Sequence, residues 1–263
     1  MIDPAELAEL RAFAVDAARA AGRITLRYFG GDLAVEEKPD ATPVTVADRR
    51  AEELLRERVA DRCPADGIVG EEFGVVEGTS GRRWTLDPID GTIAFVHGVP
   101  LYGVMVGLLD GDESVLGVVH HPALGETVSA ARGLGCARER SGGDAVEARV
   151  SEEGDLARAM VLATDFGRLP GPDLGVAFVR LREAAGELRT WGDCWGHGLV
   201  ATGRAEAMID PRMKPWDSVP LQPIVEEAGG RFTTIEGEAR PDGGSAISTN
   251  GRVHDRVLDI LLR

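Results

Sequence analysis

Apolar residues recur at helical spacing near the start of the chain. The apolar positions are Leu7, Leu10, Phe13, Ala14, Ala17, Ala18, Ala21 and Ile24. Asp3 is placed to cap a helix and Pro4 to occupy its first position, where a missing N–H is tolerated. The pattern predicts an amphipathic packing helix over residues 4–28.

A second helical pattern covers residues 46–61. Its apolar face carries Leu54, Leu55 and Val59. The pattern opens at Thr45, and Asp48 follows three residues later, which is the spacing of a capping box. Residues 36–40, Glu-Glu-Lys-Pro-Asp, predict a turn between the two helices.

From Gly67 onward the period changes to that of short strands. The predicted strands lie at 67–70, 83–86, 101–109, 114–121 and 126–131. The third and fourth are joined across Asp110-Gly111-Asp112, a hairpin sequence. Runs this short and this close along the chain favour antiparallel pairing.

Beyond residue 150, strand and helix patterns alternate. The predicted elements are a strand near 160–163, a helix at 173–186, a strand near 188–191, a helix at 194–203, a strand at 206–210, a helix at 216–228, a strand at 245–248 and a helix at 251–262. This order indicates layered α/β structure, with an α+β first part and an α/β second part. We expect two subdomains, 1–145 and 146–263, with Ser141-Gly142-Gly143 as a hairpin or junction.

Charge and composition narrow the possible partners. The chain has 44 acidic and 29 basic residues and a formal charge of −15, which argues against nucleic acid and anionic membranes as partners. A solvated surface explains much of this charge, and divalent cations can still bridge the protein to an anionic substrate. The three cysteines lack paired spacing, so no disulfide framework or zinc site is predicted. Because no signal peptide or membrane span is apparent, we expect a cytoplasmic protein.

The segment 84–92, Trp-Thr-Leu-Asp-Pro-Ile-Asp-Gly-Thr, carries the most specific chemistry. A short apolar strand runs directly into two aspartates. Pro88 restricts the backbone, so Asp87 and Asp90 are held in a defined relation and the Ile89 carbonyl can face the same place. These hard oxygen donors suit Mg²⁺.

Gly91 and Thr92 then open a predicted short helix. Free amides at such a helix start are suited to bind phosphate. The alternative interpretation of the whole segment is an ordinary Asp-Pro turn that caps a helix.

Two further acidic positions stand at the ends of predicted elements. Glu71-Glu72 follows an apolar strand, and Asp217 opens a helix after Pro215-Trp216. One glutamate and Asp217 could complete a metal site. Taken singly, a solvated loop explains the glutamates better, and an acidic residue favoured by the helix dipole explains Asp217 better.

Together these motifs carry a resemblance to a known family. The order GEE, DPIDGT and PWD, followed by a helix ending in EEAGG, resembles the inositol monophosphatase superfamily of Mg²⁺-dependent, Li⁺-sensitive phosphomonoesterases. The match runs from the first helix through Lys38-Pro39-Asp40 and Thr45-Val46-Ala47-Asp48 to the last helix. The resemblance implies an α-β-α-β-α sandwich of the sugar phosphatase type, often assembled as a homodimer.

The resemblance also implies a set of metal ligands. Glu71, Asp87 and the Ile89 carbonyl correspond to the ligands of one Mg²⁺. Asp87, Asp90 and Asp217 correspond to those of a second, so that Asp87 bridges the two ions. A third, weaker Mg²⁺ near Glu71 and inhibition by Li⁺ are expected on the same ground.

Catalytic and phosphate-binding roles follow from the same resemblance. It implies catalytic roles for Asp48, Glu71 and Thr92, with Asp48 and Thr92 orienting and helping to deprotonate the attacking water. Asp90 and the amides of Gly91 and Thr92 correspond to the phosphate-binding groups. Asp48 has the competing role of helix cap and can serve both.

The chemistry expected is in-line attack by water on a phosphate monoester. Divalent cations neutralise the phosphoryl oxygens and lower the pKa of a bound water, and acidic side chains hold the cations. No motif supplies a cysteine or histidine nucleophile. His120-His121, in a predicted strand and turn, is interpreted as structural.

The second half of the chain carries the features that bear on substrate. Residues 189–196, Arg-Thr-Trp-Gly-Asp-Cys-Trp-Gly, resemble the branch of the superfamily that hydrolyses L-histidinol phosphate. Asp193 and Asp210 could supply carboxylates near the ammonium and imidazole of that small phosphorylated metabolite. As alternatives, Trp191 belongs to the core and Asp193 is a helix N-cap.

The residues after the DGT motif depart from the family pattern, and two other functions are compatible with the sequence. Ile93-Ala94 follow the DGT motif where members commonly carry a polar or basic residue and then Asn, so contacts from that position differ. The rival functions are a phosphatase acting on inositol phosphate or another sugar or nucleotide monophosphate, and a catalytically silent relative that binds Mg²⁺.

Overall fold

The structure, a computed structural model, describes residues 2–31, 36–37, 43–141, 143–164 and 172–262. The α-helices are α1 (Pro4–Thr25), α2 (Val46–Arg62), α3 (Thr92–Val96), α4 (Pro172–Ala184), α5 (Asp193–Ala201), α6 (Pro215–Ser218), α7 (Leu221–Glu227) and α8 (His254–Leu261). The strands are β1 (Glu36–Glu37), β2 (Pro43–Val44), β3 (Gly67–Gly70), β4 (Gly74–Val76), β5 (Arg82–Asp90), β6 (Gly103–Asp110), β7 (Glu113–His121), β8 (Glu126–Ala131), β9 (Cys136–Arg140), β10 (Val146–Glu147), β11 (Met160–Ala163), β12 (Glu187–Arg189), β13 (Ala207–Asp210), β14 (Arg231–Thr233) and β15 (Ala246–Thr249).

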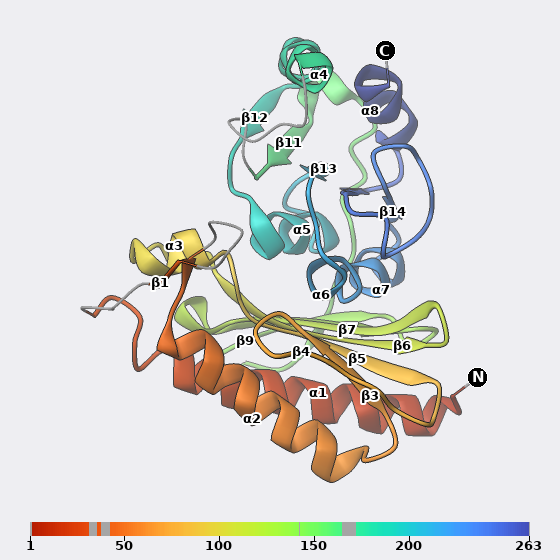
Figure 1. Cartoon of the computed structure of the whole chain (residues 1–263). Helices are drawn as coiled ribbons and strands as arrows, with labels where there is room; N and C mark the ends of the chain where they lie inside the picture. The colour runs from red at the N-terminus through yellow and green to blue at the C-terminus, as the bar shows by residue number, and fades with distance from the viewer. Residues whose placement is uncertain (1, 32–35, 38–42, 142, 165–171, 263) are drawn as a thin grey trace.

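These elements stack in five layers, which confirms the predicted α-β-α-β-α sandwich (Figure 1). Helices α1 and α2 cover the outer face of an eight-stranded sheet. Helices α5, α6 and α7 lie between that sheet and a five-stranded sheet, and α4 and α8 cover the far side of the smaller sheet. Both sheets are therefore covered on two faces, which explains their nearly continuous apolar strands.

The large sheet has the order β10-β9-β8-β7-β6-β5-β3-β4 and the small one β12-β11-β13-β15-β14. Neighbouring strands from β5 to β10 are antiparallel, as predicted, but β3 and β5 are parallel. The antiparallel prediction was wrong for β3 and β5. After β3 the chain runs back as β4, antiparallel to β3 along its outer edge. It therefore reaches the beginning of β3 again before β5 starts, and β5 runs in the same direction as β3.

Most other differences from the predicted elements lie at edges and at prolines. The helix predicted over 216–228 is divided into α6 and α7, with Pro220 at the break. The short strands β4, β9, β10 and β14 were not predicted. Residues 36–37 pair with residues 43–44 as β1 and β2 where a turn was expected, while Lys38-Pro39-Asp40 lies outside the described residues.

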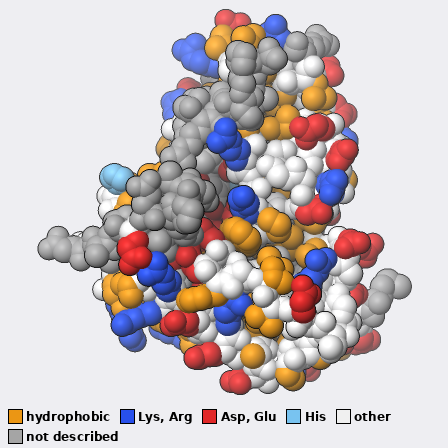
Figure 2. Space-filling model, in the orientation of Figure 1, with side chains coloured by type: hydrophobic (Ala, Val, Ile, Leu, Met, Phe, Trp, Pro, Cys, Tyr) orange, Lys and Arg blue, Asp and Glu red, His pale blue; other side chains and the backbone are white. Residues whose placement is uncertain are grey.

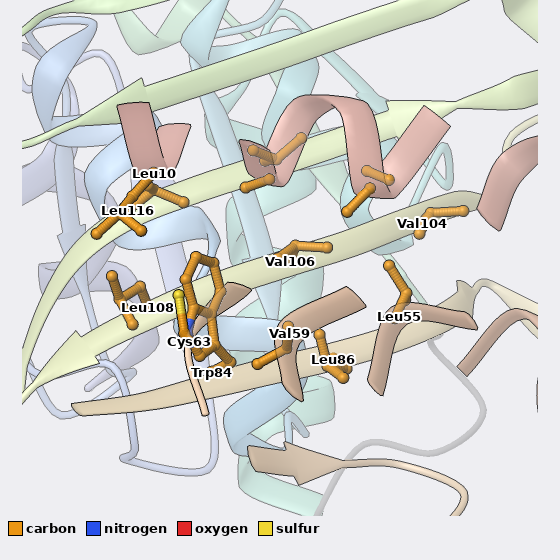
Figure 3. Close-up of a cluster of buried hydrophobic side chains, with 14 of the residues drawn as sticks. Leu10, Leu55, Val59, Cys63, Trp84, Leu86, Val104, Val106, Leu108 and Leu116 are labelled. Carbon is orange, nitrogen blue, oxygen red and sulfur yellow. The ribbon is translucent and has the colours of Figure 1, made fainter. Parts of the chain in front are cut away.

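The main core lies between α1, α2 and the large sheet (Figure 3). Its labelled members are Leu10, Leu55, Val59, Cys63, Trp84, Leu86, Val104, Val106, Leu108 and Leu116. Trp84 is fully buried, and its indole N–H donates to Asp66 at 3.0 Å. The ring of Phe13 from α1 meets Trp84 edge-on at 5.6 Å, so the predicted packing face of this helix is confirmed.

Charged side chains of both signs are interspersed on the face of the molecule drawn in Figure 2. Many form exposed ion pairs, such as Arg62 with Glu9 at 3.1 Å. Each such pair contributes at most about 1 kcal/mol, so their role is mainly in solvation. None of the described helices has the length and apolar character that crossing a bilayer requires.

Two paired glycines let the α6–α7 junction approach the large sheet. Gly107 of β6 lies opposite Gly117 of β7. A Cβ at Gly117 would stand 1.8 Å from the carbonyl oxygen of Pro220, and one at Gly107 would stand 2.9 Å from Val219 Cγ1. Because α6 carries Asp217, these glycines set how closely that aspartate approaches the end of β5.

We expect Gly117→Ala to destabilise the protein by about 2–3 kcal/mol, because backbone must move to accept the methyl group. Chemical unfolding measures the change. Gly198→Ala in α5 is the matched control, since its Cβ would meet only His121 Nε2 at 3.8 Å and alanine favours a helix. Equal stability of the two variants would contradict this account of the glycine pair.

Candidate active site

One cavity of about 470 Å³ gathers residues from both halves of the chain. Its lining consists of Glu71, Asp87, Ile89, Asp90, Gly91, Thr92, Ile93, Thr164, Asp193, Asp210, Pro211, Arg212, Lys214, Trp216 and Asp217. The residues come from the ends of β3, β5, β11 and β13 and from the starts of α3, α5 and α6. Every residue predicted for metal or substrate binding is among them, and of the predicted catalytic residues only Asp48 is not.

Three aspartates converge within this cavity. One carboxylate oxygen each from Asp87, Asp90 and Asp217 lies within 4.8 Å of the other two. Asp87 Oδ1 accepts from the Ile89 amide at 2.9 Å, and Asp217 Oδ2 accepts from the Lys214 amide at 2.8 Å. These short-range bonds hold the carboxylates in place while leaving their other oxygens for a ligand.

Asp90 ties the two halves of the site together. Its Oδ2 accepts from the Cys194 amide in the first turn of α5 at 2.6 Å. The end of β5 is thereby bonded to a helix that packs on the small sheet. A carboxylate at a helix start is also favoured by the helix dipole.

Glu71 and Asp48 flank the aspartates on the α2 side. The Glu71 amide donates to the Leu86 carbonyl at 3.1 Å, which fixes the residue beside β5. Asp48 is fully buried and forms the predicted capping box, with Thr45 N and Oγ1 donating to its Oδ2 at 2.8 and 2.6 Å. Its Oδ1 is buried without a hydrogen-bond partner in the described part of the chain.

The DPIDGT segment adopts the predicted strand–turn–helix form. Gly91 has a φ of 82° and precedes α3, so the left-handed turn there favours glycine. Thr92 Oγ1 donates to the Ile89 carbonyl at 3.1 Å. Thr92 and Asp48, the pair expected to act on water, therefore have separate hydrogen-bond partners: Thr92 bonds Ile89, and Asp48 bonds Thr45. Of the two, Thr92 lines the cavity and Asp48 does not.

Asp193 and Asp210 lie at one end of the cavity, called the organic end below, and Thr164 forms hydrogen bonds to both residues. This role of Thr164 was not predicted from the sequence. The Thr164 hydroxyl donates to Asp210 Oδ2 at 2.7 Å and accepts from the Asp193 amide at 3.1 Å. The Asp210 carboxylate and the backbone of Asp193 are thus linked through one side chain. Asp193 has a φ of 53°, which is uncommon outside glycine and marks a constrained backbone at this position.

Both structural alternatives proposed for this segment were wrong. Trp191 is 45% exposed and is not a core residue. The N-cap of α5 is Gly192, and Asp193 is the first helical residue. The sequence GDCW allowed either placement, because both residues satisfy helix-start preferences.

Two cations in the cavity were also missed by sequence reasoning. Arg212 and Lys214, from the loop between β13 and α6, line a cavity that is otherwise acidic. The sequence feature that could have indicated them is the basic pair Arg212 and Lys214, which directly precedes the PWD motif. Their charges make the cavity receptive to an anion despite the net charge of the protein.

His120 and His121 lie at the end of β7, as predicted, and have structural partners. His121 is fully buried, and its Nδ1 lies 3.1 Å from the Tyr102 carbonyl oxygen. Its ring meets Trp195 edge-on at 4.9 Å. Burial lowers the pKa of His121 to about 4, so the ring stays neutral at physiological pH.

The clustered carboxyls have raised pKa values. Burial raises the pKa of Asp87 well above its ordinary value, and the charges of Glu71, Asp90 and Asp217 raise it further. Burial also raises the pKa of Asp90 and of Asp217, with added repulsion from the neighbouring carboxylates. Each aspartate therefore resists ionising beside the others, and a cation would relieve that repulsion.

The pKa values of Asp48 and Asp210, which lie outside the cluster of three aspartates, are also raised. Burial raises the pKa of Asp48 to about 6, against the lowering effect of its bonds from Thr45. Burial likewise raises the pKa of Asp210 to about 6, although Thr164 donates to it. Perturbed carboxyls gathered in a cleft are typical of functional sites rather than of solvated surface.

The residues present fit a hard divalent cation. The donors are carboxylate oxygens and the nearby Ile89 carbonyl, and among the described residues that line the cavity there is neither a histidine nor a cysteine. Among the described residues, Asp87, Asp90 and Asp217 are the group of potential ligand side chains close enough to share an ion. Glu71 lines the same cavity and acts on Asp87 electrostatically.

Comparisons with known proteins agree with this geometry. Residues 6–261 match the model of the inositol monophosphatase family. The chain is 44% identical to the histidinol-phosphatase of Chlorobaculum parvum, over 90% of this chain and 93% of that one, and 39% identical to the histidinol-phosphatase of Mycobacterium tuberculosis, over 90% and 92%. The solved Thermotoga maritima IMPase superposes with a TM-score of 0.85 at 31% identity, covering 95% of this chain and 96% of that one.

The sandwich and its acidic cavity thus define a phosphoric monoester hydrolase. The chain belongs to the inositol monophosphatase family. The resemblance first seen in three short motifs is confirmed over nearly the whole sequence.

In the presence of a chelator, we expect the free energy of unfolding to rise as the pH falls from 8 to 7. The folded protein binds protons on these carboxyls at a pH where the unfolded chain, with aspartate pKa values near 4, keeps them ionised. Each group contributes up to about 1.4 kcal/mol per pH unit in that window. Below pH 7 this trend is opposed by the histidines, because burial lowers the pKa values of His120, His121 and His254 to about 4 and that of His197 to about 3.

Urea unfolding at pH 8, 7.5 and 7 measures this slope. Asp217→Asn removes one of the repelling charges, so its slope should be shallower and its stability at pH 8 higher. A parent protein whose stability increases with pH across this window would contradict the repulsion.

Proposed function

We propose that the protein is a Mg²⁺-dependent phosphomonoesterase that hydrolyses L-histidinol phosphate to histidinol and phosphate. The observation that carries the proposal is the convergence of Asp87, Asp90 and Asp217 in one cavity that also contains Glu71 and Thr92. The identities of 44% and 39% to proteins named histidinol-phosphatase support the choice of substrate.

In this proposal, Glu71, Asp87 and the Ile89 carbonyl hold one Mg²⁺, and Asp87, Asp90 and Asp217 hold a second. A third, weaker ion near Glu71 and inhibition by Li⁺ are part of the same proposal. When bound, Mg²⁺ supplies positive charge against the phosphoryl oxygens and makes a coordinated water more acidic. The carboxylates are held by bonds to backbone amides, so little reorganisation is needed to receive the ions.

The protein's own groups orient the substrate and handle the proton. The backbone amides of Gly91 and Thr92 receive the phosphate, and Arg212 and Lys214 add positive charge along its path. Asp48, whose pKa is raised to about 6, accepts the proton of the attacking water. Thr92 orients the attacking water through its hydroxyl.

At the organic end, Asp193 and Asp210 favour a cationic substrate. Both residues line the cavity, and the Thr164 hydroxyl bonds the Asp210 carboxylate and the Asp193 backbone amide. A buried carboxylate gains more from an ammonium or protonated imidazole than from a neutral hydroxyl group. This difference favours histidinol phosphate over a polyol phosphate.

Phosphate release from a panel of histidinol phosphate, inositol 1-phosphate and a nucleoside monophosphate tests the substrate. With Mg²⁺ present, we expect kcat/KM for histidinol phosphate to exceed the others by at least about 10-fold. With EDTA, all hydrolysis should stop. A preference for inositol 1-phosphate would reject the substrate, and hydrolysis undiminished by EDTA would reject the metal.

Asp87→Asn should lower kcat at least about 100-fold, because this residue is shared by both proposed ions. Its melting temperature in EDTA should not fall, since the substitution removes a repelling buried charge. Asp61→Asn, at an exposed position in the last turn of α2, is the matched control and should retain full activity. Near-normal turnover in the Asp87 variant would count heavily against the proposal.

A further inference from the structure

One face of α2 carries three charged residues. Asp48, Glu52 and Arg56 follow one another at intervals of four residues, so they share a face of the helix. Asp48 lies near Glu71, whose charge acts on it. Arg56 donates from Nε to Glu52 Oε1 at 2.7 Å and also donates to the Gly74 carbonyl at the start of β4.

Glu52 binds the turn that carries Glu71. Its Oε2 accepts from the Glu72 amide at 2.7 Å, and its Oε1 accepts from the Phe73 amide at 3.2 Å. These are the two residues that follow Glu71 on the way from β3 to β4. The carboxylate therefore receives two backbone amides and one guanidinium, an arrangement that fixes a turn strongly.

The contact is a built feature of the fold. Glu52 is fully buried, although burying a carboxylate is costly unless its charge is paired and bonded. Gly70 makes room for it, because a Cβ there would stand only 2.0 Å from Glu52 Oε1. A hydrophobic residue at position 52 would pack against α2 neighbours without holding the turn.

We propose that Glu52 is a positioning residue that sets the affinity of the site for its divalent cation, by fixing the turn at 71–73 and hence Glu71. Arg56 supports it by bonding both Glu52 and the far end of the same turn. The inference rests on the proposed function, because that function makes Glu71 a metal ligand. It adds a residue outside the cavity to the determinants of metal binding.

The test is calorimetric titration of the whole chain with Mg²⁺, with Glu52→Gln compared with Glu53→Gln. Both carboxylate oxygens of Glu52 accept from N–H donors, so the NH₂ group of a glutamine must replace one acceptor with a donor. In one orientation it faces the Glu72 amide, and in the other it faces the Phe73 amide and the Arg56 guanidinium. We expect Glu52→Gln to weaken Mg²⁺ binding about 10- to 100-fold. Glu53 is exposed on a different face of the helix, so its variant should bind within about twofold of the parent.

Kinetics separate positioning from general damage to the fold. At saturating Mg²⁺, Glu52→Gln should recover most of the parent kcat, whereas the Mg²⁺ concentration for half-maximal activity should rise in step with the calorimetric change. If Glu52→Gln does not fold, Arg56→Gln takes its place, with an expected weakening of about 3- to 10-fold. Parent-like Mg²⁺ affinity in the folded variant would overturn the inference.

The parent protein distinguishes this inference from the proposed function. If the parent itself binds no Mg²⁺ and hydrolyses no phosphate ester, the proposed function fails, and this inference fails with it. If the parent binds Mg²⁺ and Glu52→Gln binds it equally well, the proposed function stands and only the role of Glu52 is lost.

Discussion

The structure depends on holding carboxylates closer together than they would lie by themselves. Asp87, Asp90 and Asp217 lie within 4.8 Å of one another, in a cavity where burial and mutual repulsion raise their pKa values. Such a cluster is unfavourable unless the scaffold is rigid and a cation is bound. Each carboxylate accordingly accepts a backbone amide from a well-defined turn or helix start.

The five-layer sandwich supplies that rigidity by bringing distant segments to one place. Asp87 and Asp90 end a strand of the large sheet, while Asp217 comes from a helix packed on the same sheet through Gly107 and Gly117. The Cys194 amide adds a direct bond from Asp90 to α5. The aspartate cluster and the end of the cavity that contains Thr164 and Asp210 are thus joined through the first residues of α5, which favours precise positioning.

The sequence predicted the order of helices and strands and the acidic residues of the cavity from local patterns, and the family resemblance implied the five layers. Period and capping residues located the long helices, and three short motifs marked the acidic positions. Thr164, Glu52 and the Gly107–Gly117 pair were not foreseen, since their roles depend on contacts with residues far away in the chain. Short edge strands such as β4 and β14 were missed because they are too brief to show a period.

The central claim is that these converging carboxylates bind divalent cations. Crystals grown with Mn²⁺ in place of Mg²⁺ test it most directly, because anomalous scattering locates the ions without reference to activity. The account predicts anomalous peaks within about 2.5 Å of oxygens from Asp87, Asp90 and Asp217. A fully occupied peak elsewhere, with none among these three side chains, would contradict it.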